Sequence, residues 1–340
     1  MREWIQTLWY GRRASIGTRA ARAILTPLSI VFRLGVTLRG WMYAAGWLRV
    51  RRVDAPVVIV GNLTVGGSGK TPLVAWLAQR LGATFKVGIL LRGYGGTAHG
   101  PVQVGPQTSW EEVGDEARLL ASLTGADVVV ARDRVAGAER LAALGANLIL
   151  CDDGLQHLRL ARECEIVVVD GQRGFGNGAL LPKGPLREGI SRLKTVDVIV
   201  VNGEGGARGR IGERPQPVLT MHLTPLRVES VSGREPPLSL DWLRGRSVHA
   251  VAGLGNPARF FATLRELGAQ VREHPLPDHH RYAASDLEFG DTVPVVMSAK
   301  DAVKCRSIAR ENCWFLPVEA DFEPEAADAL VDVITHSVRR

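Results

Sequence analysis

The 340-residue sequence has few cysteines and no long uninterrupted apolar run. Its four cysteines, Cys151, Cys164, Cys305 and Cys313, are dispersed and form no C-x-x-C pair. Four scattered thiols in a chain of this length are typical of a reducing compartment rather than of a disulfide scaffold. We therefore expect neither disulfides nor a structural zinc site.

The amino-terminal arm, residues 1–50, lacks an uncharged stretch long enough to span a membrane. Arg33 and Arg39 separate its apolar stretches at 24–32 and 41–48, whereas a spanning helix needs about 18 or more apolar residues. It also lacks a small-residue cleavage site after a short apolar region, so we expect no secretory signal. We expect the arm to lie on a bilayer or to enter it shallowly.

The sequence beyond residue 55 has no excess of positive charge. Residues 1–55 carry ten arginines against two acids, or +8, and the remainder carries 32 basic and 33 acidic residues, or −1. Nucleic-acid proteins more often spread basic residues over a recognition surface, whereas an arginine-rich arm mixed with apolar residues also suits an anionic membrane. We predict an anionic membrane surface and no nucleic acid as partner. The alternative is that the arm's apolar side chains pack on the protein's own core.

A chain of 340 residues, 46% hydrophobic and 23% charged, is long enough for two domains. From residue 56, short β-branched runs alternate with helical patterns, which indicates βαβ units and a parallel sheet. Strands are expected at 57–60, 86–91, 128–131, 148–151, 166–170, 196–201, 247–253 and 292–297, and helices at 71–81, 115–124, 134–144, 257–267 and 324–338. We predict an α/β fold with a P-loop NTPase-type parallel-sheet domain at 51–220. A smaller α/β domain at 221–340 would close the cleft, and residues 1–50 would form an amphipathic membrane-associated helix, with a loop at 203–217 near the boundary.

A glycine-rich turn between an apolar strand and a helix is the strongest local signal, and it reads GNLTVGGSGKTP at 61–72. Such a turn lets backbone N–H groups face phosphate oxygens, while Lys70 reaches the β and γ phosphates and Thr71 ligates Mg²⁺. The predicted nucleotide-binding residues are Thr64, Val65, Gly66, Gly67, Ser68, Gly69, Lys70 and Thr71. The motif departs from G-x-x-x-x-G-K-[ST] at Thr64, and the alternative is an ordinary strand–helix turn.

Paired acids follow the apolar run at 148–151. A P-loop needs a carboxylate at the end of a neighbouring strand to hold its metal, and Asp152 and Asp153 supply one. With Thr71, they are the predicted magnesium ligands, although paired acids at a strand end are also simple turn-formers. Gln156 and His157 follow at the same sheet edge and are predicted to line the acceptor site.

A nucleotide site alone does not define a reaction, so a small-molecule kinase, a regulatory GTPase and a membrane-attached ATPase driving a protein partner are all compared. No Asn-Lys-x-Asp motif follows a strand, so guanine selectivity is unsupported. A kinase needs an acceptor cleft with a base and cationic groups, and the chain has a candidate for each.

Several motifs follow one another along the chain: GNLTVGGSGKTP at 61–72, GDE at 114–116, DDGLQH at 152–157, GNG at 176–178, LPKGPLRE at 181–188, GLGNPARFF at 253–261 and PDHH at 277–280. Together and in this order they resemble the tetraacyldisaccharide 4′-kinase family of lipid A biosynthesis. The resemblance extends from about residue 29 to the last helix, and Thr64 is normal for that family. One departure is SAKD at 298–301, where the family usually has Thr-Glu-Lys-Asp.

The resemblance implies transfer of the ATP γ-phosphate to the 4′-hydroxyl of a tetraacylated glucosamine disaccharide 1-phosphate, with ATP and Mg²⁺ as cofactors. It places the enzyme at the cytoplasmic face of a bacterial inner membrane, as a peripheral or monotopic protein with no obligate protein partner. An ATPase that acts on a protein partner is the alternative.

Asp115, which follows Gly114 at the start of a helix, is the candidate base for the acceptor hydroxyl. Its alternative role is helix capping, because Asp is a favoured N-cap residue. The resemblance implies His279 as its partner, since the position matches the family's Asp-His, and only motif order separates it from His280. Lys183 and Arg187 are expected to meet anionic groups on substrate or nucleotide, and Lys70 completes the predicted catalytic set.

Overall fold

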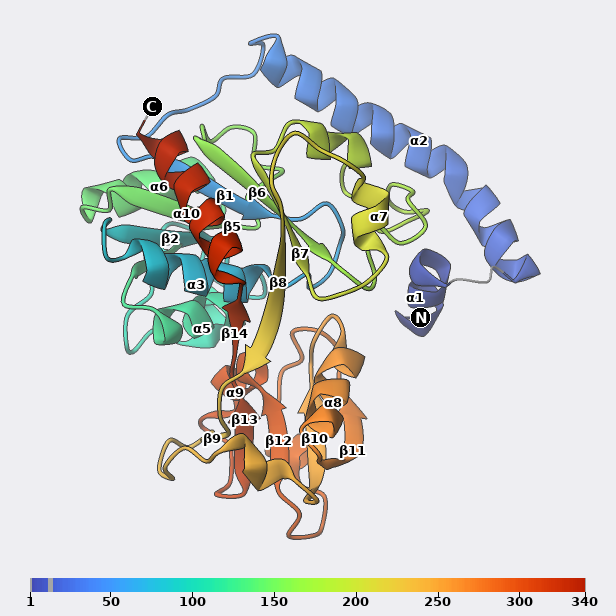
Figure 1. Cartoon of the computed structure of the whole chain (residues 1–340), viewed down its shortest axis with the longest axis vertical. Helices are drawn as coiled ribbons and strands as arrows, with labels where there is room; N and C mark the ends of the chain where they lie inside the picture. The colour runs from blue at the N-terminus through green and yellow to red at the C-terminus, as the bar shows by residue number, and fades with distance from the viewer. Residues whose placement is uncertain (1, 12–14, 340) are drawn as a thin grey trace.

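The computed structural model of the chain describes residues 2–11 and 15–339. Arg12 and Arg13, two of the arginines of the arm, lie outside the described residues. The rest forms two α/β units, a larger one that contains the glycine-rich turn and a smaller one, with the arm at the side of the larger unit (Figure 1). The α/β class and the parallel sheet predicted from the sequence are confirmed.

The larger unit is built on a nine-stranded sheet with the order β14-β8-β7-β6-β1-β5-β2-β4-β3. Its strands are β1 (Val57–Gly61), β2 (Val87–Leu91), β3 (Val102–Gln103), β4 (Asp127–Val130), β5 (Leu148–Asp152), β6 (Cys164–Asp170), β7 (Val198–Asn202), β8 (Val218–Pro225) and β14 (Val318–Asp321). Neighbouring strands are parallel except at the two edges, where β3 and β14 are antiparallel. The central strands β1, β2 and β5 are buried along their whole length and almost entirely apolar, because helices cover both faces of the sheet.

Two layers of helices enclose this sheet. The helices are α3 (Lys70–Leu81), α4 (Trp110–Val113), α5 (Asp115–Leu123), α6 (Arg134–Ala143), α7 (Ala207–Ile211) and α10 (Pro324–Val338), with the 3₁₀ turn η1 (Ile190–Lys194). Helices α3, α5 and α10 share one apolar cluster, to which Leu77, Leu120 and Ile334 belong. Helices α6 and α7 and the turn η1 share the other cluster. All the strands that the sequence predicts for 51–220 are therefore held between two cores.

The smaller unit has a five-stranded sheet with the order β11-β10-β12-β13-β9. Its elements are β9 (Glu229–Ser230), η2 (Leu240–Leu243), β10 (Ser247–Ala252), α8 (Pro257–Glu266), β11 (Gln270–Pro275), η3 (Ala284–Leu287), β12 (Val295–Ser298), α9 (Ala299–Cys305) and β13 (Cys313–Leu316). Proline at the start of α8 suits the first helical turn, where its missing N–H is not needed.

The expected division at residue 220 differs from the structure at both ends of the smaller unit. Strand β8 continues to Pro225, and β14 pairs with it antiparallel, with Val318 opposite Pro225. Helix α10 then packs on the larger sheet through Leu330 and Ile334. The smaller unit is thus an insertion between the neighbouring strands β8 and β14 of the larger sheet. The chain returns to the larger unit because α10 buries its apolar face there. The predicted loop at 203–217 also contains the short helix α7.

The arm forms two helices, α1 (Arg2–Tyr10) and α2 (Ile16–Ala44). The two apolar stretches lie on one 29-residue helix that includes Pro27, in agreement with the predicted amphipathic helix of the arm. Neither uncharged stretch is long enough to span a membrane by itself, because Arg33 and Arg39 interrupt them, but the whole helix is long and apolar enough, by length and composition, to cross one. Figure 1 shows α2 along the outside of the larger unit, away from both sheets.

Candidate active site

The glycine-rich turn, residues 62–69, connects the end of β1 to the start of α3. Gly66 and Gly69 have φ values of 108° and 94°, a region that glycine adopts without steric cost. Helix α3 begins at Lys70, so the backbone N–H groups of its first turn face the turn's concave side, as an anion site requires. All eight residues predicted to bind nucleotide, from Thr64 to Thr71, lie in this turn or at the start of α3.

A second loop, residues 176–188, packs on the glycine-rich turn. The backbone N–H of Val65 donates to the carbonyl oxygen of Pro185 at 2.9 Å, and that of Arg187 donates to Leu63 at 2.7 Å. Thr64 forms an isolated β-bridge with Leu186. Two segments more than a hundred residues apart in the sequence therefore pack together, and these two backbone hydrogen bonds fix their relative position.

Asp153 lies between two cations. Arg187 donates to both of its carboxylate oxygens, at 2.7 and 3.0 Å, and Lys70 Nζ lies 3.5 Å from Oδ1. Burial acts to raise the pKa of Asp153, but Lys70 and Arg187 outweigh burial and hold that pKa well below its usual range. Asp153 therefore orients Lys70 and Arg187, and its oxygens are already occupied by them.

Asp152, its neighbour, has the opposite environment. It is 3% exposed, and burial, followed by the nearby Glu116, raises its pKa to about 7. The Thr71 hydroxyl donates to its Oδ2 at 3.4 Å, whereas Oδ1 is buried without a hydrogen-bond partner.

A free carboxylate oxygen beside a hydroxyl fits a hard divalent cation such as Mg²⁺. Among the described residues, no three His, Cys, Asp or Glu side chains gather as a metal cluster. Mg²⁺ is commonly bound through one or two protein ligands and completes its coordination with substrate phosphates and water. Asp152 and Thr71 are the better-placed ligands, because Asp153 is engaged by cations.

Asp115 is the first residue of α5, and residues of the smaller unit surround its carboxylate. It is 3% exposed, and His279 Nδ1 lies 3.1 Å from its Oδ2. The Nζ atoms of Lys300 and Lys304 lie 3.9 and 3.7 Å from the same oxygen. Gly114 takes the N-cap position of α5 without a side-chain cap, and Asp115 Oδ1 accepts from the backbone N–H of Glu116 at 2.9 Å. The carboxylate therefore satisfies one donor of the first turn while its other oxygen faces His279.

The structure separates the two adjacent histidines. His279 contacts Asp115 and packs against the ring of Tyr94, with ring centres 4.7 Å apart, whereas His280 Nε2 lies 3.0 Å from Asp286 in its own unit. His279 has a φ of 59°, so the backbone turns the two imidazoles in different directions. Only His279 reaches the candidate base.

Charge compensation explains how Asp115 stays ionised. Its burial acts to raise its pKa, but the hydrogen bond from His279, followed by the charges of Lys300 and Lys304, lowers it below the usual value. The sequence reasoning missed both lysines. The SAKD segment at 298–301, which contains Lys300, was noted only as a departure from the family's Thr-Glu-Lys-Asp. Lys304 follows one helical turn after Lys300 on α9, and its side chain is fully buried.

The predicted acceptor-site residues lie along the same sheet edge. Gln156 Nε2 donates to Glu188 Oε1 at 2.7 Å, a partner that sequence reasoning missed although Glu188 ends the LPKGPLRE motif. Burial, followed by the charge of Arg134, lowers the pKa of His157 to about 4, so this imidazole is neutral at pH 7. Lys183 is partly exposed in the neighbouring loop, where its carbonyl oxygen accepts from Asn177 at 2.9 Å.

The smaller unit closes over the glycine-rich turn. A Cβ added at Gly255 would lie 3.0 Å from the backbone nitrogen of Gly67, so a larger residue here would press on the glycine-rich turn. Arg173 of the larger unit donates to the Gly255 carbonyl oxygen at 3.2 Å. The site is therefore formed at the junction of the two units.

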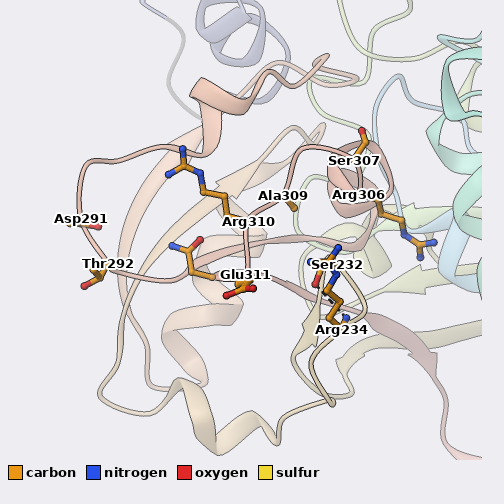
Figure 2. A pocket seen from close by; sticks show the side chains of 10 residues that line it. Ser232, Arg234, Asp291, Thr292, Arg306, Ser307, Ala309, Arg310 and Glu311 are labelled. Carbon is orange, nitrogen blue, oxygen red and sulfur yellow. Dashed lines mark hydrogen bonds between the residues drawn. The ribbon is translucent and has the colours of Figure 1, made fainter.

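A cavity of about 690 Å³ lies elsewhere, on the smaller unit, and Ser232, Asp291 and Arg310 are part of its lining. Figure 2 shows the side chains of Arg306 and Arg310 pointing in opposite directions, so they do not converge on one anion. The contacts around Asp115 and Lys70, rather than cavity size, mark the candidate active site.

Comparison with known proteins agrees with this geometry. The family model described as LpxK, tetraacyldisaccharide-1-P 4′-kinase, matches residues 21–335. The chain belongs to this family. It is 48% identical to the tetraacyldisaccharide 4′-kinase of Alkalilimnicola ehrlichii, over 90% of each chain. It is 42% identical to that of Methylobacillus flagellatus, over 99% of this chain and 97% of the relative. The membership predicted from sequence motifs is confirmed.

A solved relative has the same fold. The crystal structure of LpxK from Aquifex aeolicus in complex with ATP superposes with a TM-score of 0.77 at 31% identity. The match covers 94% of this chain and 99% of the relative. Both units of the kinase fold are therefore present in this chain.

The contact between His279 and Asp115 predicts a measurable pKa change. His279→Ala should raise the pKa of Asp115, because its hydrogen bond is the largest influence that opposes burial. A carboxyl ¹³C NMR titration would measure this. His280→Ala is the matched control and should leave the Asp115 pKa unchanged, since His280 contacts Asp286. Equal shifts in both variants would contradict the assignment.

Proposed function

We propose that this protein transfers the γ-phosphate of ATP to the 4′-hydroxyl of a tetraacylated glucosamine disaccharide 1-phosphate, which forms lipid IVA in lipid A biosynthesis. Membership of the tetraacyldisaccharide 4′-kinase family supports this function. So does a P-loop beside a buried carboxylate with a histidine partner. The ATP complex of the Aquifex aeolicus relative favours ATP as the donor. These observations favour a kinase over an ATPase that drives a protein partner.

In this proposal the P-loop binds and orients the triphosphate. Backbone N–H groups at the start of α3 and the ammonium of Lys70 neutralise its charge, which is the main task in phosphoryl transfer. Asp153, which is itself held by Arg187, keeps Lys70 in place. Asp152 and Thr71 would hold Mg²⁺, which supplies further charge neutralisation at the phosphates when it is bound.

Asp115 would orient the attacking 4′-hydroxyl and accept its proton. A carboxylate held below its usual pKa is a weak base, but phosphoryl transfer through a loose transition state asks chiefly for orientation of the nucleophile. His279 would fix the carboxylate and share the proton, because its Nδ1 already lies within hydrogen-bonding distance. Gln156, His157 and Lys183 would line the acceptor site, with Arg187 at its edge near the phosphates.

The arm would bring the enzyme to its lipid substrate. A stripe of exposed apolar side chains follows helical spacing along α2; its members are Ile24, Leu28, Val31, Leu34, Leu38 and Trp41, each at least 52% exposed. These side chains do not pack on the protein's own core, contrary to the alternative left open by the sequence. Arg19, Arg33 and Arg39 are exposed on the same helix, and each arginine near an anionic surface contributes about 1 kcal/mol of attraction. We place this surface at the cytoplasmic face of the inner membrane, with a peripheral or monotopic attachment.

Replacing the P-loop lysine tests the function directly. Lys70→Ala should abolish transfer of ³²P from Mg-ATP to tetraacyldisaccharide 1-phosphate while the protein stays folded, because the lost ammonium serves phosphates rather than the core. Lys86→Ala is the matched control and should keep full activity, since Lys86 is exposed and contacts the Leu144 carbonyl. Near-normal transfer by Lys70→Ala at saturating ATP would refute the P-loop assignment.

Asp115 can be tested against its alternative as a structural residue. Asp115→Ala and Asp115→Asn should lower kcat by about 10²–10⁴, the usual contribution of a positioned base. Asp133→Ala is the matched control, because Asp133 caps α6 and should lose about 1 kcal/mol of stability with kcat unchanged. If the Asp115 variants behave like the Asp133 variant, Asp115 is merely structural.

The exposed stripe of α2 predicts membrane binding. The triple variant Leu28→Glu, Val31→Glu and Leu38→Glu should bind anionic vesicles at least about a hundredfold more weakly, since each apolar side chain contributes about 1.5–3 kcal/mol when buried. Its apparent KM for lipid presented in vesicles should rise, while ATP binding stays unchanged. Leu226→Glu, at an exposed leucine outside the arm, is the control. Unaltered vesicle sedimentation of the triple variant would show that the arm serves only the fold.

A further inference from the structure

The GLGNPARFF motif at 253–261 contributes a side chain to the larger unit. Arg259 lies in the first turn of α8, and its Nη2 donates to Oδ1 of Asn202 at 2.9 Å. Asn202 is the last residue of β7 and is 2% exposed. The contact therefore crosses from the smaller unit to the sheet edge that carries the glycine-rich turn.

The same amide reaches the glycine-rich turn. Asn202 Nδ2 donates to the carbonyl oxygen of Ser68 at 2.9 Å, and Ser68 is itself buried. A Cβ added at Gly69 would collide with this amide. Asn202 therefore fits directly against the two residues that precede Lys70, and the backbone of the turn depends on where the amide lies.

Hydrogen-bond chemistry allows this amide only one orientation. An arginine has donors and no acceptor, so Arg259 must face the amide oxygen, and the Ser68 carbonyl only accepts, so it must face the amide nitrogen. Without Arg259, only the Ser68 contact would hold the amide. A Cβ at Gly203 would lie 3.3 Å from Arg259 Nη2, so the guanidinium also fits closely against the chain that follows Asn202.

We propose that Arg259 is a positioning residue that acts through Asn202 and sets the Ser68–Gly69 backbone for the nucleotide when the smaller unit closes. The inference rests on the proposed function in taking a triphosphate as the ligand of the turn. Closure of the smaller unit would then strengthen binding of the β and γ phosphates, because the same movement that brings Gly255 to Gly67 brings Arg259 to Asn202.

Nucleotide affinity of the full chain in detergent tests this relay. Calorimetry with ATP and with AMP would compare wild type, Arg259→Ala, Asn202→Ala and the double variant. Each single exchange should weaken ATP binding about tenfold, the usual effect of losing a hydrogen bond to a charged group, and should leave AMP binding unchanged. The double variant should bind ATP no more weakly than Asn202→Ala, because non-additivity identifies residues that act as one unit.

Two further variants control the measurement. Arg265→Ala removes another arginine of α8, which pairs with Glu273 inside the smaller unit, and should keep wild-type affinity. Arg259→Lys keeps a cationic donor group and should bind ATP more tightly than Arg259→Ala, although more weakly than wild type. This variant also tests the relay if Arg259→Ala fails to fold.

Equal losses for ATP and AMP would overturn the proposal, as would additive losses in the double variant, which would show that Arg259 acts on the nucleotide directly. Nucleotide binding requires no lipid, so a protein that fails to phosphorylate the lipid would refute the proposed function without altering this result.

Discussion

Asp115 can remain charged in its buried position only because cationic groups lie around it. Taking a carboxylate out of water without partners costs several kcal/mol, and its own helix supplies no cation that offsets this. The imidazole of His279 and the ammonium groups of Lys300 and Lys304 all come from the smaller unit. The low pKa and the orientation of the buried candidate base therefore depend on the position of a unit to which it does not belong. The two units cannot separate without exposing Asp115 to water and removing the partners that orient it.

Burial and neighbouring charges also give the two adjacent acids at the end of β5 opposite pKa shifts. Asp153 turns toward Lys70 and Arg187 with a φ of 51° and keeps a low pKa. Asp152 stays on the strand, and burial together with Glu116 gives it a pKa of about 7. Of these two adjacent residues, Asp153 therefore pairs with Lys70 and Arg187, whereas Asp152 keeps one carboxylate oxygen without a hydrogen-bond partner. A strand end with a single carboxylate would have to serve both purposes with the same two oxygens.

Local signals in the sequence were sufficient to predict the strand, turn and helix around Lys70, because the glycines of the turn and the start of the helix lie within the twelve residues 61–72. The pair of Asp115 and His279, 164 residues apart, required the family resemblance. Motif order alone favoured His279 over His280, and the structure shows why: His280 contacts Asp286 instead. Lys304 and Arg259 could not be predicted, because their partners are brought near only by the packing of the units. Strand β14 has four residues and no turn signature of its own, so only its pairing with β8 reveals which sheet it belongs to. An amphipathic helix in the arm was predictable from its mixture of arginines and apolar residues, but the sequence pattern did not reveal that α2 runs unbroken past Arg33 and Arg39 for 29 residues.

The insertion of the smaller unit between β8 and β14 also bears on how this architecture could have been assembled. The chain leaves the large sheet at Pro225 and returns at Val318, and these two residues are direct partners in an antiparallel pair. Such partners have Cα atoms about 4.5–5.5 Å apart, a gap that a tight hairpin turn closes. A simpler ancestor with an ordinary hairpin at this edge would already have had the complete sheet, the glycine-rich turn and the terminal helix. Acquisition of the smaller unit would then have required only an insertion into the turn of that hairpin. The residues on either side of the insertion, Pro225 and Val318, would already have been strand partners.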